Sequence, residues 1–303
     1  MGNLSRISDV GYVQGVSMNS LIPLYPFCII IGILISIITV AYFWRKENYP
    51  IELLLKIIII TIPSSIFGAR LFYIFERLIY NPSDPFPGSA WYAVWEGGLS
   101  IQGGVVVPTI LNLLFIRRHK DVLDIRKTFG IILPTVLVGQ AIGRWGNFAN
   151  HEVYGKIVQE WEVSWLGPFI SSHMFIAGEA GGTPEFRAPL FLYESIASLI
   201  GYVLIVWVIL NLGLTKPGTP GALYLIWYGL TRVSMEPLRE ESYAYYTVLS
   251  VLSIILGLLL TLYFYKKSFK LYNIEIIGKT RRYILKTQQK AQLVAVGKKW
   301  INE

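Results

Sequence analysis

Long uncharged runs of aliphatic and aromatic residues alternate with short polar segments along most of the chain. A helix needs about 20 mainly apolar residues to cross the hydrocarbon core of a bilayer, and about seven segments approach this length. We therefore predict an all-α integral membrane protein. The predicted spans are residues 22–44, 53–75, 98–116, 128–148, 189–210, 221–235 and 247–265, of which the third and sixth carry the most glycine and polar residues.

Two stretches break this pattern. Residues 150–188, between the fourth and fifth spans, are long, polar and rich in glycine and tryptophan, which predicts a small head of short strands or loops. Residues 266–303 follow the last span and are basic. We therefore predict a seven-span domain over residues 1–265 that carries the head, and a basic tail over residues 266–303.

Composition agrees with a bilayer as the main solvent. The chain is 53% hydrophobic and only 15% charged, whereas soluble domains carry about 25% charged residues. Cys28 is the single cysteine, which excludes a disulfide framework and argues against a cysteine-based metal cluster.

A net charge of +8 alone would be compatible with nucleic-acid binding. The basic residues, however, gather in short loops and in the tail, which indicates a different role. With seven spans they fall on one side, which the positive-inside bias assigns to the cytoplasm, with the N-terminus and the head outside. We expect no nucleic-acid partner. These basic segments are residues 45–46, 117–120, 126–127, 216 and 266–290.

Charged residues inside the predicted spans indicate a functional site, because they are costly in hydrocarbon. Arg70, Arg144 and Arg232 lie late in spans that run outward. Tyr25 and Gln102 lie early in spans that run inward. A rise of about 1.5 Å per residue places all five side chains in the outer half of the bilayer.

Several arginines at one depth repel one another unless anions lie between them. Glu236 follows Arg232 by four residues and precedes Arg239 by three, so the three can share a helix face. Pro237 is predicted to end or kink the helix there. Any remaining positive charge suits a phosphate, which arginine binds in a bidentate manner. The candidate counter-ions are Glu76, Glu96, Glu152, Glu194 and Glu236.

Structural explanations compete with this prediction. Each arginine can pair with a carboxylate or extend its side chain to the outer interface without binding a ligand. The glycine-rich residues 97–104 can line a ligand site or simply allow close helix packing.

The fourth span ends in a distinctive motif, Gly143-Arg144-Trp145-Gly146-Asn147-Phe148-Ala149-Asn150-His151-Glu152-Val153-Tyr154-Gly155. It is similar to the pattern G-R-x-G-N-F-x-N-x-E-x-x-G of the phosphatidylglycerol–prolipoprotein diacylglyceryl transferases of bacteria. The similarity extends over nearly all of the chain before the tail. Supporting matches are Gly68–Leu71, the double-glycine segment before the third span, Leu192–Glu194 and Arg232–Arg239.

The resemblance implies a multi-pass enzyme of the bacterial cytoplasmic membrane. Its reaction moves the diacylglyceryl group of phosphatidylglycerol to the lipobox cysteine of a prolipoprotein signal peptide, and it implies no cofactor and no metal. The catalytic residues expected here are Arg144, Arg232, Gln102 and Tyr25. The residues expected to bind phosphatidylglycerol are Arg144, Asn147, Arg232, Arg70, Glu152, Gly155, Glu236 and Arg239.

Gln102 departs from the family, which commonly has histidine at this position. Glutamine does not titrate, so it cannot act as a general base. Two alternatives follow. Either the arginines favour the thiolate directly, since neighbouring cations lower a thiol pKa from about 8.5, or another group such as His151 takes the proton.

Two further functions compete with the transferase. A transporter or channel for an anion or lipid would continue polar residues to the cytoplasmic side of the spans. Residues 29–38 and 57–62 are instead mostly apolar, which favours a site open to one side only. A non-catalytic lipid-binding scaffold would bind phosphatidylglycerol without turnover.

Overall fold

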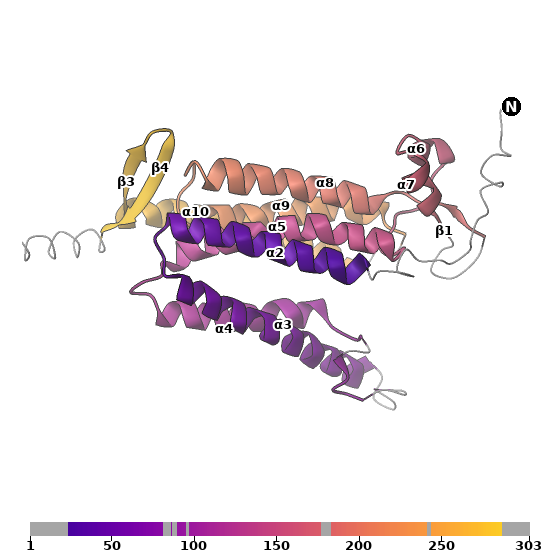
Figure 1. Cartoon of the computed structure of the whole chain (residues 1–303), viewed down its shortest axis with the longest axis horizontal. Helices are drawn as coiled ribbons and strands as arrows, with labels where there is room; N and C mark the ends of the chain where they lie inside the picture. Colours follow the sequence, from indigo (N-terminus) through magenta and orange to yellow (C-terminus); the bar gives the residue numbers. More distant parts are fainter. Residues whose placement is uncertain are drawn as a thin grey trace, which may run out of the picture. The chain divides into compact units, whose positions relative to one another are not determined.

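The structure, a computed structural model, describes residues 24–80, 86, 90–94, 97–176, 183–240 and 244–286. The candidate counter-ion Glu96 and residues 287–303 of the tail lie outside the described residues. The chain divides into two compact units, one of residues 1–39 and 130–303 and the other of residues 40–129. Figure 1 shows the helices of both units.

A helix forms at each of the predicted spans. Among the described residues, the helices α2, α3, α5, α8 with its continuation η3, and α10 are long and apolar enough to cross a membrane, which makes five. This confirms a mainly helical, multi-span membrane protein. The helices α4 and α9 have 18 and 17 residues and fall outside that group, so the number of seven spans stays a prediction. The bounds are α2 Leu24–Lys46, α3 Ile51–Tyr80, α4 Ile101–Arg118, α5 Ile125–Ala149, α8 Leu190–Tyr202, η3 Val203–Leu210, α9 Thr219–Met235 and α10 Ala244–Leu271.

The smaller unit is built on the pairing of α3 with α4. Glycines at the crossing let the two backbones approach closely, since a Cβ added to Gly68 would lie 2.4 Å from the carbonyl oxygen of Gly103. Farther along the pair, Asn112 Nδ2 donates a hydrogen bond of 2.8 Å to Thr61 Oγ1. Small residues at the crossing and hydrogen bonds such as this one therefore help to join the two helices.

The larger unit packs its helices side by side (Figure 1). Between α2 and α5, a Cβ on Gly32 would lie 3.1 Å from the Cα of Gly139, and Ser36 Oγ donates to the Thr135 carbonyl at 3.0 Å. Helix α9 packs along α10. These contacts fix α5, α8 and α9, the three helices that carry the charged residues described below.

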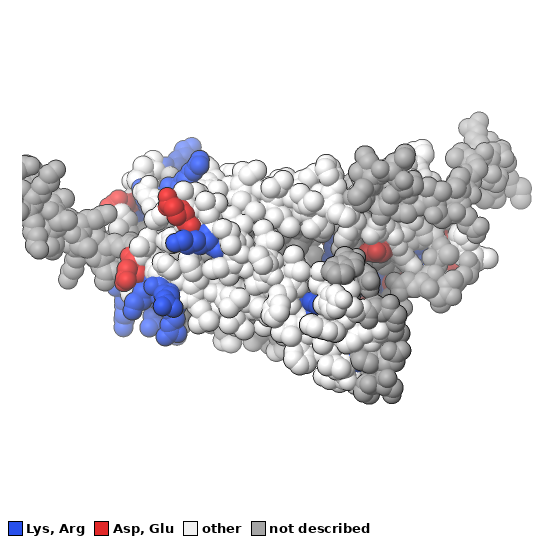
Figure 2. Space-filling model, turned by 60° about the horizontal axis from the view of Figure 1, so that its bottom comes forward, with Lys and Arg blue, Asp and Glu red and all other residues white. Residues whose placement is uncertain are grey.

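Apolar side chains cover much of the helix surface. Isoleucine and leucine residues of α2, α3, α4 and α10 are widely exposed in the absence of lipid. On the face drawn in Figure 2, uncharged side chains fill the wide middle region, and charged side chains gather mainly toward one end. Such a surface is stable only where hydrocarbon covers it.

Short elements form the predicted head between α5 and α8. They are α6 (Glu160–Ser164), α7 (Pro168–His173) and an antiparallel pair of strands, β1 (Phe175–Ile176) and β2 (Glu185–Phe186). An insertion of short elements thus lies where the sequence predicted a head, but the prediction of strands or loops missed the two short helices.

The C-terminal ends of α9 and α10 test two predictions made from the sequence. Helix α9 stops at Met235, and a 3-10 turn, η4 (Glu236–Leu238), follows it, so Pro237 ends the helix as predicted. Helix α10 continues to Leu271, beyond the predicted end at residue 265. It is followed by an antiparallel hairpin of β3 (Tyr272–Ile277) and β4 (Thr280–Leu285), so the first part of the basic tail is folded.

Candidate functional site

A buried cluster of charged side chains centres on Glu194 of α8. This carboxylate forms an ion pair with Arg144 of α5, and its Oε1 lies 2.6 Å from Arg239 Nη2. Arg232 Nη1 of α9 is 4.0 Å from the same oxygen. Two distant regions of the chain, the end of α5 and residues 232–239, therefore bring three arginines to one carboxylate of α8.

Glu236 supplies the second carboxylate of the cluster. Its Oε2 is 3.1 Å from Arg232 Nη2 and 3.7 Å from Arg239 Nε. The spacing of four and three residues therefore places these side chains together, as the sequence predicted. Both Glu194 and Glu236 are buried, so their charges act in a medium of low dielectric constant.

Counted over the described residues, the cluster holds three guanidinium groups against two carboxylates, which leaves an excess of one positive charge. Arg144 is the most exposed of the three arginines, with 27% of its side chain accessible compared with 14% for Arg232 and 11% for Arg239. Arg144 is therefore the member of the cluster whose side chain is most open to its surroundings.

Neutral polar groups border Arg144. Asn147, one turn later on α5, accepts a hydrogen bond of 3.3 Å from Arg144 Nη1. Tyr25 of α2 packs against Gly146, where an added Cβ would lie 3.0 Å from the tyrosine ring. Asn147 therefore lies beside Arg144, whereas Tyr25 contacts the next turn of the same helix and its place in a shared ligand site stays a prediction.

Gly155 joins the motif at the end of α5 to the segment that carries Arg239. It forms an antiparallel bridge with Arg239, and its amide donates to the Ala188 carbonyl at 3.0 Å. A Cβ at this position would lie 2.6 Å from Ala188 Cβ and 2.9 Å from the Leu238 carbonyl oxygen. Gly155 therefore supports the site through its backbone, by allowing Arg239 to approach.

The backbone between α5 and Gly155 is strained. His151 and Val153 have φ values of 54° and 58°, a region that side chains with a β-carbon seldom occupy and that is costly for a branched valine. Glu152 lies between them, and its Oε1 accepts a hydrogen bond of 3.1 Å from Asn150 Nδ2. Strain of this kind persists where the surroundings over-determine it, and it often marks functional segments.

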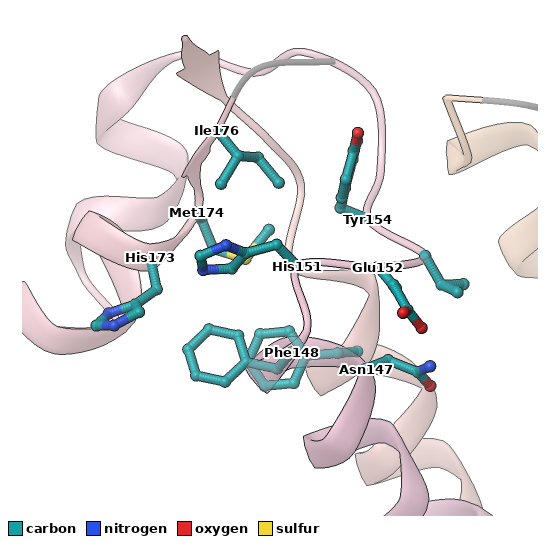
Figure 3. Close-up of a pocket in the computed structure, with 10 residues that line it drawn as sticks. Asn147, Phe148, His151, Glu152, Tyr154, His173, Met174 and Ile176 are labelled. Atoms are coloured by element: carbon teal, nitrogen blue, oxygen red, sulfur yellow. The ribbon is translucent and has the colours of Figure 1, made fainter. Parts of the chain in front are cut away.

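A small pocket lies beside this strained segment (Figure 3). The rings of Phe148 and Phe191 stack at 4.3 Å along one wall. Most of its lining is apolar, so it suits an apolar group or the packing of the head against the helices. Its lining residues are Asn147, Phe148, His151, Glu152, Val153, Tyr154, His173, Met174, Ile176 and Phe191.

His151 turns its ring into this pocket, toward His173, and Glu152 and Asn147 lie on the other side of the segment (Figure 3). The two imidazole centroids are 6.0 Å apart. Burial, and to a lesser extent the nearby His173, lowers the pKa of His151. This orientation gives no support to His151 as a base beside the arginine cluster.

Arg70 has a different setting, in the smaller unit. Its guanidinium donates to the carbonyl oxygens of Trp91 at 2.7 Å, Ala90 at 2.8 Å, Gly97 at 2.8 Å and Gly98 at 3.1 Å. These contacts engage most of the five N–H donors of an arginine. Arg70 therefore holds the loop between α3 and α4, and its predicted contact with a lipid head group stays a prediction.

Gln102 lies at the start of α4 in a polar group of the same unit. Ser100 Oγ is 2.7 Å from Oε1 of Gln102 and 2.7 Å from Oε1 of Glu76. Since a hydroxyl donates one hydrogen bond, Ser100 is a partner shared by the amide and the carboxylate. The hydrogen bond from Ser100 thus holds Gln102 in place at the N-terminus of a helix, a contact that no sequence pattern predicts.

The sequence named Glu194 only as a possible counter-ion, whereas the structure makes it the common partner of Arg144, Arg232 and Arg239. The available signal was an isolated carboxylate in an otherwise apolar span. Within the described residues, no group of three or more histidine, cysteine or acidic side chains is placed to hold a metal ion.

A multi-span helical membrane protein with a buried arginine cluster and one excess positive charge belongs to a class that binds anionic, membrane-embedded ligands. The comparisons with known proteins identify the family. The family model described as prolipoprotein diacylglyceryl transferase matches residues 16–263. The chain belongs to this family.

Relatives from several bacteria agree with this assignment. A phosphatidylglycerol–prolipoprotein diacylglyceryl transferase of Mycoplasmopsis pulmonis is 57% identical over 243 residues, which cover 79% of this chain and 76% of the relative. Proteins of the same description from Streptococcus equi subsp. zooepidemicus and Streptococcus pneumoniae are 37% and 32% identical, over 72% and 82% of this chain and 79% and 92% of their own lengths.

Proposed function

We propose that this chain transfers the diacylglyceryl group of phosphatidylglycerol to the lipobox cysteine thiol of prolipoproteins in the bacterial cytoplasmic membrane. The product is a thioether, and glycerol phosphate leaves. The observation that carries the proposal is the excess positive charge at Arg144, Arg232 and Arg239, with Arg144 accessible. The names of the relatives support the same activity.

The reaction breaks a carbon–oxygen bond, so negative charge grows on the departing phosphate. Preorganised cationic donors in a water-poor site stabilise such charge most effectively. Arg144 receives the phosphate, with Arg232 and Arg239 adding positive potential. Asn147 and Tyr25 provide neutral polar groups at the edge of the same site.

The attacking sulfur must become a thiolate. Arginines close to a thiol lower its pKa, so the cluster can promote both nucleophile formation and phosphate departure without a histidine. In this scheme Gln102, held by Ser100, orients the head group or the peptide and carries no proton. The reaction requires neither a metal nor a cofactor.

We also propose seven spans, with the N-terminus and the head outside. Helix α4 packs along α3 and helix α9 along α10, and α3 and α10 are both long enough to cross the membrane. A short helix beside a spanning helix can cross with it when glycines and polar side chains face protein. Under this topology the basic loops lie in the cytoplasm.

The direct test uses the purified full-length chain, phosphatidylglycerol labelled in its acyl chains and a lipobox peptide. We expect label on the peptide cysteine in thioether linkage and release of glycerol phosphate. Arg144→Lys should lower the rate by about 100-fold, the effect of losing one preorganised donor, and the exposed Arg118→Lys should not.

Phosphatidylglycerol binding without turnover would indicate a scaffold, and movement of lipid between leaflets without turnover would indicate a transporter.

The proton acceptor can be tested separately. Gln102→Ala should retain most of the transfer activity, and Arg144→Ala should abolish it. His151→Ala should also retain activity, since its ring faces away from Asn147. If His151→Ala alone prevents thiolate formation while lipid binding persists, the scheme without a base is wrong.

A further inference from the structure

The hairpin β3–β4 lies beyond residues 16–263, the region that the family model matches. Its strands pair in register from Tyr272 opposite Leu285 to Ile277 opposite Thr280. A two-residue turn, Gly278 and Lys279, connects them, and Gly278 has the positive φ of 60° that such turns require at this position. The hairpin is therefore a regular element in its own right.

The hairpin is docked on the rest of the larger unit through β4. The Arg281 amide donates to the Leu212 carbonyl, after η3, at 3.0 Å. Tyr272 and Tyr283 are buried, with their rings 6.3 Å apart. A Cβ on Gly213 would lie 2.0 Å from the Arg281 carbonyl oxygen, so the two segments are in close contact. This contact fixes the hairpin crosswise at the end of α10 (Figure 1).

The turn of the hairpin and most of β3, the strand that faces away from this contact, are exposed. No atom lies within 4 Å of a Cβ built on Gly278. Beside it, Ile276 and Ile277 are 73% and 56% exposed. Two adjacent bare isoleucines at the end of a fixed hairpin are unfavourable in water and favourable in an apolar environment.

Positive charge lies at this apolar tip and again at the base of the hairpin. Residues 266–286 contain seven basic residues and one acidic residue, Glu275, which is paired across the strands with Arg282. The exposed basic residues are Lys266, Lys267, Lys270, Lys279, Arg281 and Lys286. The combination of an apolar tip and basic residues is typical of segments that lie in the interface of an anionic membrane.

We propose that the β3–β4 hairpin binds the anionic phospholipids of the leaflet at the C-terminal end of α10. Ile276 and Ile277 enter the interface, and the basic residues contact the head groups. The hairpin begins one residue after a membrane-spanning helix ends, so the lipid surface is within its reach. A nucleic acid would meet the same charges but would leave the two isoleucines in water.

The test places a reporter at the tip of the full-length protein. Ile276→Cys in a Cys28→Ser background carries an environment-sensitive fluorophore, and the protein is placed in nanodiscs. We expect a blue shift of the emission in phosphatidylcholine bilayers that contain phosphatidylserine, relative to phosphatidylcholine alone. Phosphatidylserine is used because it supplies the negative charge and is not the proposed substrate, so this result is independent of the transferase activity.

Two controls make the result specific. Replacing Lys270, Lys279 and Arg281 by glutamine should abolish the shift, and about 1 M salt should reduce it, since screening then acts beyond about 3 Å. A label at exposed Ser164 of the head should not respond to phosphatidylserine. Transfer activity with phosphatidylglycerol in the charge variant shows whether its helices are folded.

The proposal is overturned if the Ile276 label reports the same environment in both bilayers, or if the shift survives removal of the three charges. It is also overturned if the label responds to added RNA or to an acidic protein and not to phosphatidylserine.

Discussion

Glu194 shows how a single residue organises the site. Its carboxylate faces three arginines from α5, α9 and the segment after η4, and it is buried. Without it, three guanidinium groups would share one remaining carboxylate in a low-dielectric environment. Removing one partner of a buried ion pair typically costs about 3–5 kcal/mol, mainly because the other charge stays unpaired.

We therefore predict that Glu194→Gln lowers the free energy of unfolding by about 3 kcal/mol and abolishes transfer. Thermal unfolding in detergent and the turnover assay measure the two effects. The matched control is Glu240→Gln, which loses one ion pair of 2.7 Å with Arg187 but is more exposed. Equal melting temperatures for Glu194→Gln and the native chain would contradict the structural part of this prediction.

The lowered pKa of His151 predicts how the free energy of unfolding depends on pH. Its pKa in the folded protein is lowered by burial and by His173, relative to about 6.5 in the unfolded chain. Below about pH 6.5 the unfolded state therefore binds more protons than the folded state, and stability falls as the pH falls. His151→Gln should melt with a smaller difference between pH 7.5 and pH 5.5 than the native chain. An unchanged difference would show that other groups set the acid sensitivity.

At the scale of secondary structure, the sequence predicted the long helices because each depends on a local run of apolar residues. Contacts between segments were harder to predict. The hydrogen bonds of Arg70 to the carbonyls of a loop 20 to 28 residues away are one example that no sequence pattern indicates. The β3–β4 hairpin was missed because its basic composition was typical of a solvated tail, and its docking on Leu212 depends on tertiary structure.

The close packing of Gly155 leads to a prediction about how the end of the α5 motif contacts the Arg239 segment. A Cβ there would lie within 3.0 Å of two carbonyl oxygens and closer still to Ala188 Cβ, so Gly155→Ala must push the bridged Arg239 segment away. We expect a loss of about 1–3 kcal/mol, as for other overpacked positions, together with reduced transfer. Gly104→Ala is the control, since its Cβ would meet only ordinary contacts at 3.5 Å or more. Normal stability of Gly155→Ala would mean that the bridge is dispensable.

At the scale of the whole molecule, the side of the membrane on which each loop lies depends on whether α4 and α9 cross it. If both cross, the head between α5 and α8 lies outside, and the loops after α4 and η3 lie in the cytoplasm. If neither crosses, these three positions exchange sides. With the N-terminus outside, as we propose, the C-terminal hairpin would lie in the cytoplasm in both cases, because an odd number of spans precedes it.

Cysteine accessibility distinguishes the two topologies. In a Cys28→Ser background, single cysteines replace Ser164 of the head, Lys120 after α4, Leu214 after η3 and Ile276 of the hairpin. We predict that a membrane-impermeant maleimide applied to intact cells labels position 164 and leaves positions 120 and 214 unlabelled until the membrane is opened. Position 276 should stay protected in either topology, so its labelling would reveal leaky cells. The reverse labelling pattern at positions 120, 164 and 214 would support five spans. The head, and the end of α5 that carries Arg144, would then lie on the cytoplasmic side. A signal peptide presents its lipobox cysteine on that side only before it is translocated. The basic residues at positions 117–120 favour the first outcome, since in the second they would lie on the outer face against the positive-inside bias.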